Sequence, residues 1–229
     1  MESELSFKGF TMEASQFMLE LKFNNDRSWF KPRKDQFDQI VYDPFKALAR
    51  ETTAELQKMF PEKEFDLHVS RIYRDARRLY GRGPYKEALW FSLKTWNGSM
   101  RGPGFWFEFN PVEYSFGMGT WDASAEQMEQ WRVSIEANPA AFERILEKLE
   151  QHPELEIAGP MYKRQKKDMG KRLNPWYNQR QVQVICTKEF GGDILDPKFP
   201  KILAEEYAAL MPLYDYLLIH CPPVPYRNH

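Results

Sequence analysis

The chain has 229 residues, of which 42% are hydrophobic and 15% aromatic, so it can bury a core without support from disulfides or metals. Its formal net charge of −1 excludes the strongly basic composition that is typical of nucleic-acid-binding domains. Its two cysteines, Cys186 and Cys221, show no close spacing, which predicts unpaired thiols in a reducing compartment.

Targeting signals are absent from the expected places. The first residues lack the basic and apolar regions of a signal peptide. The longest apolar stretch, residues 213–221, is interrupted by Asp215 and is far shorter than the ~20 residues of a membrane helix. We therefore expect a cytoplasmic protein with no membrane association.

Apolar spacing predicts helices in the first sixty residues. One helix is expected over residues 12–23, followed by the polar run 24–26, where Asn25 or Asp26 would cap the next helix. We expect Trp29, in that next helix, to be buried against the sheet. A longer helical region is predicted over residues 33–60, with a kink or restart at positions 43–44, an Asp-Pro pair.

The centre of the chain alternates between polar and apolar residues and is rich in aromatic residues, which predicts strands. Four strands are expected, at residues 67–73, 87–95, 104–110 and 113–120. In the first of them, the alternation places Arg71 on the same face as Leu67 and Val69. The Asn-Pro pair at 110–111 predicts a hairpin, and the short connections favour antiparallel pairing.

The last third of the chain returns to helical patterns. Helices are predicted over residues 124–137, 140–151 and 199–216, the last with a break at Pro212. Strands are predicted at 155–157 and 181–187, and the segment from Pro222 onward is expected to be irregular.

This order of elements defines an α+β fold, with a mostly antiparallel central sheet and helices from both chain ends packed against it. We expect a single domain over residues 1–229. It would consist of an N-terminal helical part at 1–60, a strand-rich part at 65–120, and C-terminal helices and a strand at 124–220.

Several chemistries lack their motifs. The sequence contains no Walker-type phosphate loop, no GxGxxG after a strand and no GxSxG nucleophile elbow. Its four histidines are scattered and neither cysteine has a neighbouring partner, so the spacing of a zinc site is missing. We therefore expect no cofactor and no metal.

One basic segment stands out. RIYRDARR, starting at Arg71, and GPYK, ending at Lys86, place several cations after a predicted strand. Arginine offers paired planar donors and lysine a mobile charge, which together suit phosphate or carboxylate. The candidate ligand-binding residues are Arg27, Arg71, Arg74, Arg77, Tyr85 and Lys86. Asp75 is the candidate acid–base group. The alternative is that these arginines are structural and pair with carboxylates such as Asp26 or Asp75.

Three motifs in this order resemble the family catalogued as domain of unknown function 2461. The chain has NNDRSWF, RIYRDARR and GPYK where the family shows a helix entry with an Asn pair and Trp-Phe, then R-I-x-R-D-x-R-F and T-P-Y-K. The similarity spans about residues 6–188. The loop 78–82 departs from the family pattern. The matching residues are Asn25, Arg27, Trp29, Phe30, Arg71, Arg74, Asp75, Arg77, Pro84, Tyr85 and Lys86. The resemblance implies a shared fold and motif set, with no established activity, substrate or cofactor.

Three hypotheses for function stay open at this point. The first is a pocket for an anionic small molecule, with or without catalysis. The second is association with nucleic acid through the basic segment 162–172, which the acidic net charge disfavours. The third is a non-catalytic interaction protein. The sequence does not define an oligomeric state.

Overall fold

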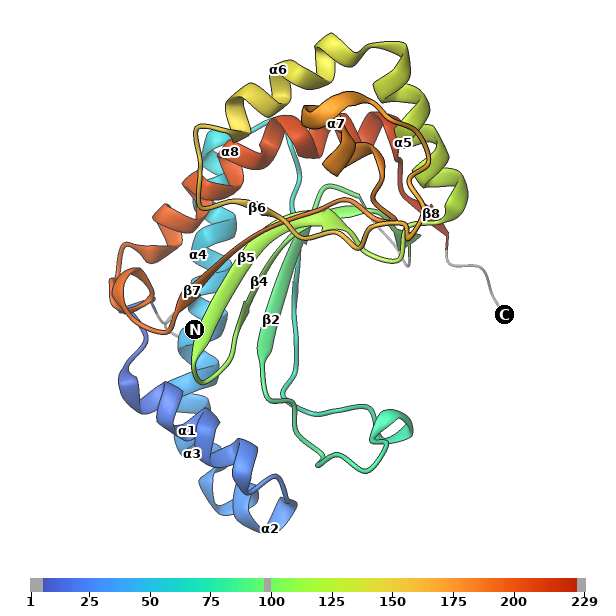
Figure 1. The fold of residues 1–229 in the computed structure, drawn as a ribbon. Helices are drawn as coiled ribbons and strands as arrows, with labels where there is room; N and C mark the ends of the chain where they lie inside the picture. The colour runs from blue at the N-terminus through green and yellow to red at the C-terminus, as the bar shows by residue number, and fades with distance from the viewer. Residues whose placement is uncertain (1–5, 97–99, 226–229) are drawn as a thin grey trace.

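The computed structural model describes residues 6–96 and 100–225. Its main sheet has six strands in the order β1-β2-β4-β5-β7-β6, and each neighbouring pair is antiparallel. The strands are β1 Asp66–Val69, β2 Leu89–Lys94, β4 Pro103–Phe109, β5 Glu113–Thr120, β6 Glu156–Ile157 and β7 Gln183–Glu189. Helices α4 (Asp43–Met59) and α8 (Phe199–His220) contact each other and cover one face of this sheet (Figure 1). The predicted α+β class, with helices from both ends of the chain, is confirmed.

Alternation along the strands builds the core between this face and the helices. Phe105, Phe107 and Phe109 are fully buried, while the residues between them are partly exposed. The Phe45 ring of α4 packs 6.3 Å from the Phe107 ring, and the Tyr214 ring of α8 packs 4.6 Å from the Phe105 ring. Burial of these large aromatic surfaces is the main stabilising contribution to the fold.

The N-terminal helices follow the prediction closely. Helix α1 spans Met12–Phe23, and α2 (Arg27–Phe30) leads through a 3-10 turn (Lys31–Arg33) into α3 (Lys34–Phe37). A π-helical turn, Asp38–Tyr42, comes directly before α4, which begins at Asp43 with Pro44 in its first turn. The expected irregularity at the Asp-Pro pair is therefore present, because proline cannot donate the backbone hydrogen bond of a regular helix there.

The entry into α2 was predicted half correctly. The Asp26 side chain accepts a hydrogen bond from the Trp29 backbone N–H at 2.9 Å, so Asp26 is the N-cap. The prediction that Trp29 is buried against the sheet is wrong. Trp29 is only partly buried and packs against Phe17 of α1, with the Arg33 guanidinium 4.6 Å from its ring centroid. The fully buried neighbour is Phe30, because α2 turns that side inward.

The first predicted strand is shorter than expected. Strand β1 stops at Val69, which pairs with Phe91, and pairing resumes only at an isolated bridge between Tyr73 and Tyr85. Three residues separate Val69 from Tyr73, whereas five separate Tyr85 from Phe91, so the two segments change register like a bulge. As a result Arg71 is exposed and Ile72 is buried, and the expectation that Arg71 shares the face of Leu67 and Val69 is wrong.

The predicted hairpin and the helices after it are present. The Asn110 side chain accepts backbone hydrogen bonds from Val112 and Glu113 between β4 and β5. Helix α5 (Ala125–Ala137) starts with a capping box at Ser124, and α6 (Pro139–Leu149) is capped by Asn138.

Three features near the C-terminus correct the sequence-based expectations. A helix that was not predicted, α7 (Gly170–Tyr177), overlaps the end of the basic segment. Helix α8 continues through Pro212 without the predicted break, because Met211 and Leu213 on either side of it are buried. The segment after Pro222 is not fully irregular, since β8 (Val224–Pro225) pairs with β3 (Met100–Arg101). No helix among the described residues is long and apolar enough to cross a membrane.

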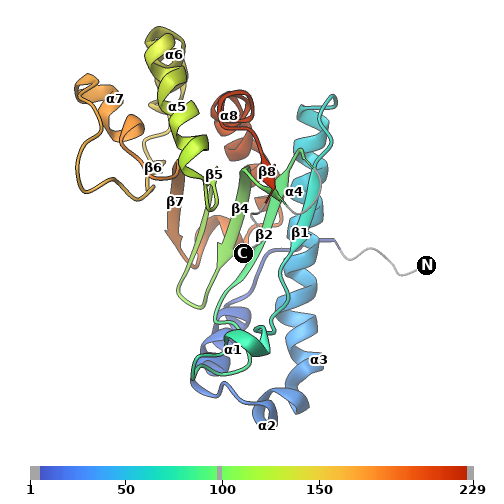
Figure 2. The same cartoon turned by 90° about the vertical axis from the view of Figure 1, so that its right-hand side faces the viewer.

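The other face of the sheet is not covered in this way. Figure 2 shows β7, β5, β4, β2 and β1 side by side. Cross-strand pairing sets Trp90 beside Glu108 and Ser92 beside Trp106 on this open face. Each of these four side chains is partly exposed, in contrast to the buried positions that alternate with them. The open face therefore combines polar and aromatic side chains, as sites for small molecules do.

Candidate ligand-binding groove on the open face of the sheet

The three sequence motifs meet around Tyr85. The Asn25 amide donates to the Tyr85 carbonyl at 3.0 Å and accepts from the Tyr85 backbone N–H at 2.9 Å. Gly83 allows this approach, since a Cβ at that position would lie 2.3 Å from Asn25 Oδ1. Because both backbone groups of Tyr85 are paired, Asn25 fixes the start of the segment that carries Lys86.

Arg74 also contacts the Tyr85 backbone, so it belongs to the same contact between the motifs. Its Nε donates to the Tyr85 carbonyl at 2.7 Å and its Nη2 lies 3.3 Å from Glu87 Oε1. Its side chain is only 15% exposed. These two contacts tie Arg74 to the segment 85–87, so Arg74 helps to hold the loop together.

Asp75 and Arg77 pair with each other at the surface. Arg77 Nε and Nη2 lie 3.1 and 2.8 Å from the two oxygens of Asp75. The same carboxylate accepts the backbone N–H of Arg77 and so caps the 3-10 turn Ala76–Arg78. An exposed carboxylate held this way has neither the burial nor the cavity that an acid–base group requires.

Tyr85 and Arg27 lie on the side of α2. The Tyr85 side chain is 2% exposed and its ring packs 4.3 Å from the Phe30 ring, so it contributes to the core and is not presented to a ligand. Burial raises the pKa of its phenol, and the nearby charge of Arg27 partly opposes that rise. Arg27 itself is exposed.

Lys86 and Arg71 are neighbouring members of the predicted cluster that keep their charge available. Among the described residues, no carboxylate lies within 4 Å of either side chain. Lys86 is partly buried, and that burial, followed by the charges of Arg71 and Arg74, lowers the pKa of its ammonium group. Three cations are therefore close enough to influence one another, and only Arg74 has a paired carboxylate.

Lys86 lies at the edge of a hollow in the sheet. Its Nζ is 5.6 Å from the centroid of the Trp90 ring, and Trp90 lines a cavity of about 580 Å³ on the open face. We call this cavity the open-face groove. Its wall includes Trp90, Ser92, Lys94, Trp106, Glu108 and Trp121. Gly104 and Gly119 pair with each other beneath the cavity, and because neither has a side chain, they leave its volume open.

Two polar groups in the groove have unusual surroundings. Burial raises the pKa of the Glu108 carboxyl, and the negative charge of Glu113 raises it further. The Trp106 indole Nε1 is shielded from solvent and has no acceptor among the described residues. A buried donor without a partner is uncommon in folded proteins, and one that lines a cavity is a natural contact for a ligand acceptor.

The open-face groove was missed in the sequence because each strand contributes only alternate residues to it. The signal in the sequence was the set of alternate strand positions that point away from the core. Trp90 and Ser92 on β2, and Trp106 and Glu108 on β4, alternate with fully buried apolar residues. That pattern marks a sheet face that is not sealed by helices.

The basic segment 162–172 is partly paired with acidic neighbours. Lys167 Nζ lies 2.9 Å from Glu136, and Arg172 Nη2 lies 2.8 Å from Glu150. Lys166 lies over the ring of Tyr162, with its Nζ 4.5 Å from the centroid. Acidic residues of α5 and at the end of α6 thus pair with two of its cations, Lys167 and Arg172.

The fold and groove together define an α+β protein built on an antiparallel sheet with one open, aromatic face. The chain belongs to the family of conserved hypothetical proteins called DUF2461, whose family model matches residues 13–216. A comparison with curated proteins gives no match. The resemblance inferred from the three motifs is confirmed, and those motifs supply Asn25, Phe30, Arg74 and Tyr85 to one joint.

Proposed function

We propose that the protein binds an anionic small molecule that carries a planar ring, with the ring in the open-face groove and the anionic group beside Lys86 and Arg71. The supporting observation is the position of Lys86. It is a partly buried cation without a carboxylate partner among the described residues, and it adjoins the Trp90 ring at the edge of the cavity. An anion placed there would offset the mutual repulsion of Lys86, Arg71 and Arg74.

The groove supports the ring part of the proposal. Its volume of about 580 Å³ lies within the range of sites for small molecules, roughly 300–1,000 Å³. Trp106 and Trp121 pack with ring centroids 5.7 Å apart on its wall, and exposed indole faces stack on planar groups. The indole N–H of Trp106 would gain an acceptor from such a ligand.

In this proposal Glu108 replaces Asp75 as the candidate acid–base residue. It lines the cavity, and its raised pKa keeps it protonated to a higher pH than a surface carboxyl. A protonated carboxyl can donate a hydrogen bond to the ligand or transfer a proton to it, which Asp75, paired with Arg77, is not arranged to do.

Isothermal titration calorimetry with three probes tests the proposal. Adenosine 5′-monophosphate carries a ring and an anion, adenosine carries the ring alone, and inorganic phosphate carries the anion alone. The monophosphate should bind more tightly than either of the others. Lys86→Met should weaken its binding about 10–100-fold, the cost of one charge-assisted hydrogen bond. Trp106→Leu should weaken the monophosphate and adenosine alike, because it removes a stacking surface.

Lys198→Met provides the matched control. Lys198 is an exposed lysine immediately before α8, on the helical side of the sheet, and it should leave binding unchanged. Equal effects of Lys86→Met and Lys198→Met would contradict the assigned anion position. If none of the three probes binds the wild-type protein, the hypothesis of an interaction protein with structural arginines becomes the better one.

A further inference from the structure

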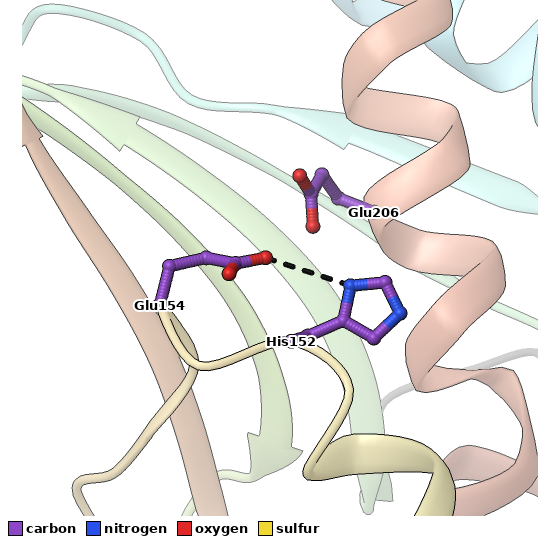
Figure 3. A group of neighbouring side chains, drawn as sticks. All are labelled: His152, Glu154 and Glu206. Carbon is purple, nitrogen blue, oxygen red and sulfur yellow. Dashed lines mark ion pairs between the residues drawn. The ribbon is translucent and has the colours of Figure 1, made fainter.

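A second group of polar side chains lies on the helix-covered side of the sheet, away from the open-face groove. His152 and Glu154 follow α6, and Glu206 comes from α8; the three side chains point toward one another (Figure 3). One ligand atom from each lies within 4.8 Å of the others, and His152 Nδ1 is 3.5 Å from Glu154 Oε1. An imidazole nitrogen and two carboxylate oxygens are thus gathered from segments more than fifty residues apart in sequence.

One oxygen of Glu206 has no hydrogen-bond donor within the described part of the chain. Its Oε2 is shielded from solvent, and no described residue donates a hydrogen bond to it. A shielded carboxylate oxygen without a donor is costly, because it has lost its hydration without gaining a hydrogen bond. Burial raises the pKa of Glu206, and the charge of Glu154 raises it further.

The neighbouring charges do not remove this imbalance. The positive charge of Lys188 partly offsets the negative charge of Glu206, but Lys188 Nζ pairs with Asp193 at 3.1 Å. Cys186 lies nearby on β7 and is buried and neutral, because burial raises the pKa of its thiol. Within the described part of the chain, the two carboxylates therefore face each other and an imidazole without an ion pair to a lysine or arginine.

We propose that His152, Glu154 and Glu206 bind a divalent transition-metal ion, with Zn²⁺ as the best fit. Zinc takes histidine nitrogen and carboxylate oxygen at about 2.0–2.2 Å, and three protein ligands leave one position of a tetrahedral site to water. Hard cations such as Ca²⁺ prefer six or more oxygen ligands and do not favour imidazole. Side-chain rotations of His152 and the exposed Glu154 can bring the ligand atoms to this distance, because both lie on a connecting segment.

This site also explains why the sequence indicated no metal. Zinc motifs are recognised in a sequence from ligands that are close together in it. Here the third ligand, Glu206, comes from α8, and only the packing of α8 on the sheet brings it close to the other two. The inference does not rest on the proposed ligand of the open-face groove, since none of the three residues lines that cavity.

The test is Zn²⁺ binding to chelator-treated protein, measured by calorimetry and by the shift in melting temperature. The wild-type protein should bind one Zn²⁺ and melt at a higher temperature with it, because an ion that binds only the folded state stabilises it. Glu206→Gln and His152→Asn should each weaken binding by at least about 10–100-fold, the loss seen even for residues that only support metal ligands. Ca²⁺ should give no comparable stabilisation.

Glu205→Gln is the matched control. Glu205 is the preceding residue of α8, is exposed, and pairs with Lys201 instead of the site. It should bind Zn²⁺ as the wild type does. Without metal, Glu206→Gln should melt no lower than the wild type, because it removes a buried like charge, so its loss of binding would not reflect unfolding. Equal Zn²⁺ binding by wild type and Glu206→Gln, or none by wild type, would overturn the proposal.

Discussion

Removing the Asn25 side chain should destabilise the protein through one backbone group. In Asn25→Ala the N–H of Tyr85 loses its acceptor at 2.9 Å, and Tyr85 is 2% exposed, so water does not readily replace it. The Tyr85 carbonyl also loses a donor but keeps Arg74 Nε at 2.7 Å. The free energy of unfolding should therefore fall by about 1–3 kcal/mol, the cost of one buried donor left unpaired.

Urea denaturation monitored by tryptophan fluorescence measures this change, and hydrogen exchange localises it. The Tyr85 amide should exchange faster in Asn25→Ala, whereas amides in the core of β4 should change only by the global loss of stability. Asn24→Ala is the matched control, because the neighbouring amide donates to the Glu20 carbonyl at an exposed helix end. That change should cost about 0.5 kcal/mol or less. Equal destabilisation by the two substitutions would refute the role assigned to Asn25.

Two further predictions follow from burial. Trp29→Ala should lower the free energy of unfolding by about 1–2 kcal/mol in a denaturant melt, because Trp29 keeps contact with solvent and with Arg33. A fully buried aromatic residue would cost ~3–5 kcal/mol. A loss above about 1–2 kcal/mol would therefore contradict the partial burial of Trp29. Burial raises the pKa of Cys221 to about 12 from an ordinary value of 9.0, so its thiol should resist a thiol reagent at pH 8 until the protein is unfolded. Because the pKa of this thiol is higher in the folded state, its stabilising contribution is complete below pH 9 and is lost as the pH rises toward 12. Denaturant melts at successive pH values should show this decline in the wild type and a smaller decline in Cys221→Ala.

The parts of the fold that sequence predicted well are those where one local signal decides the structure. Helix α1 matches its predicted bounds because its apolar residues recur at helical spacing. The Asn-Pro hairpin between β4 and β5 is present because the Asn110 side chain accepts the backbone hydrogen bonds of the turn. Pro212 shows the opposite case. Its local preference for a break is overridden by the burial of Met211 and Leu213 on both sides, a contribution that exists only once α8 packs on the sheet.

The candidate sites were harder to predict than the fold because they depend on register and packing. A strict alternation through residues 67–73 predicted the wrong side for Arg71, since the extra residues opposite it change the register before Tyr73. The cluster of arginines was recognised, but sequence could not separate Arg74, which pairs with Glu87, from Lys86, which does not pair with any described carboxylate. The grouping of Glu206 with His152 is a product of tertiary structure alone.

The contact between α4 and α8 has a consequence for the order of folding. The strands β1, β2, β4 and β5 are neighbours in sequence and can pair early, but β7 joins them only after some sixty further residues, and α8 comes later still. Until α8 emerges from the ribosome, the aromatic face formed by Phe105 and its neighbours has no cover next to α4. During synthesis the nascent chain therefore exposes an apolar sheet face for the time needed to translate about a hundred residues, and transiently exposed apolar surface of this kind promotes aggregation.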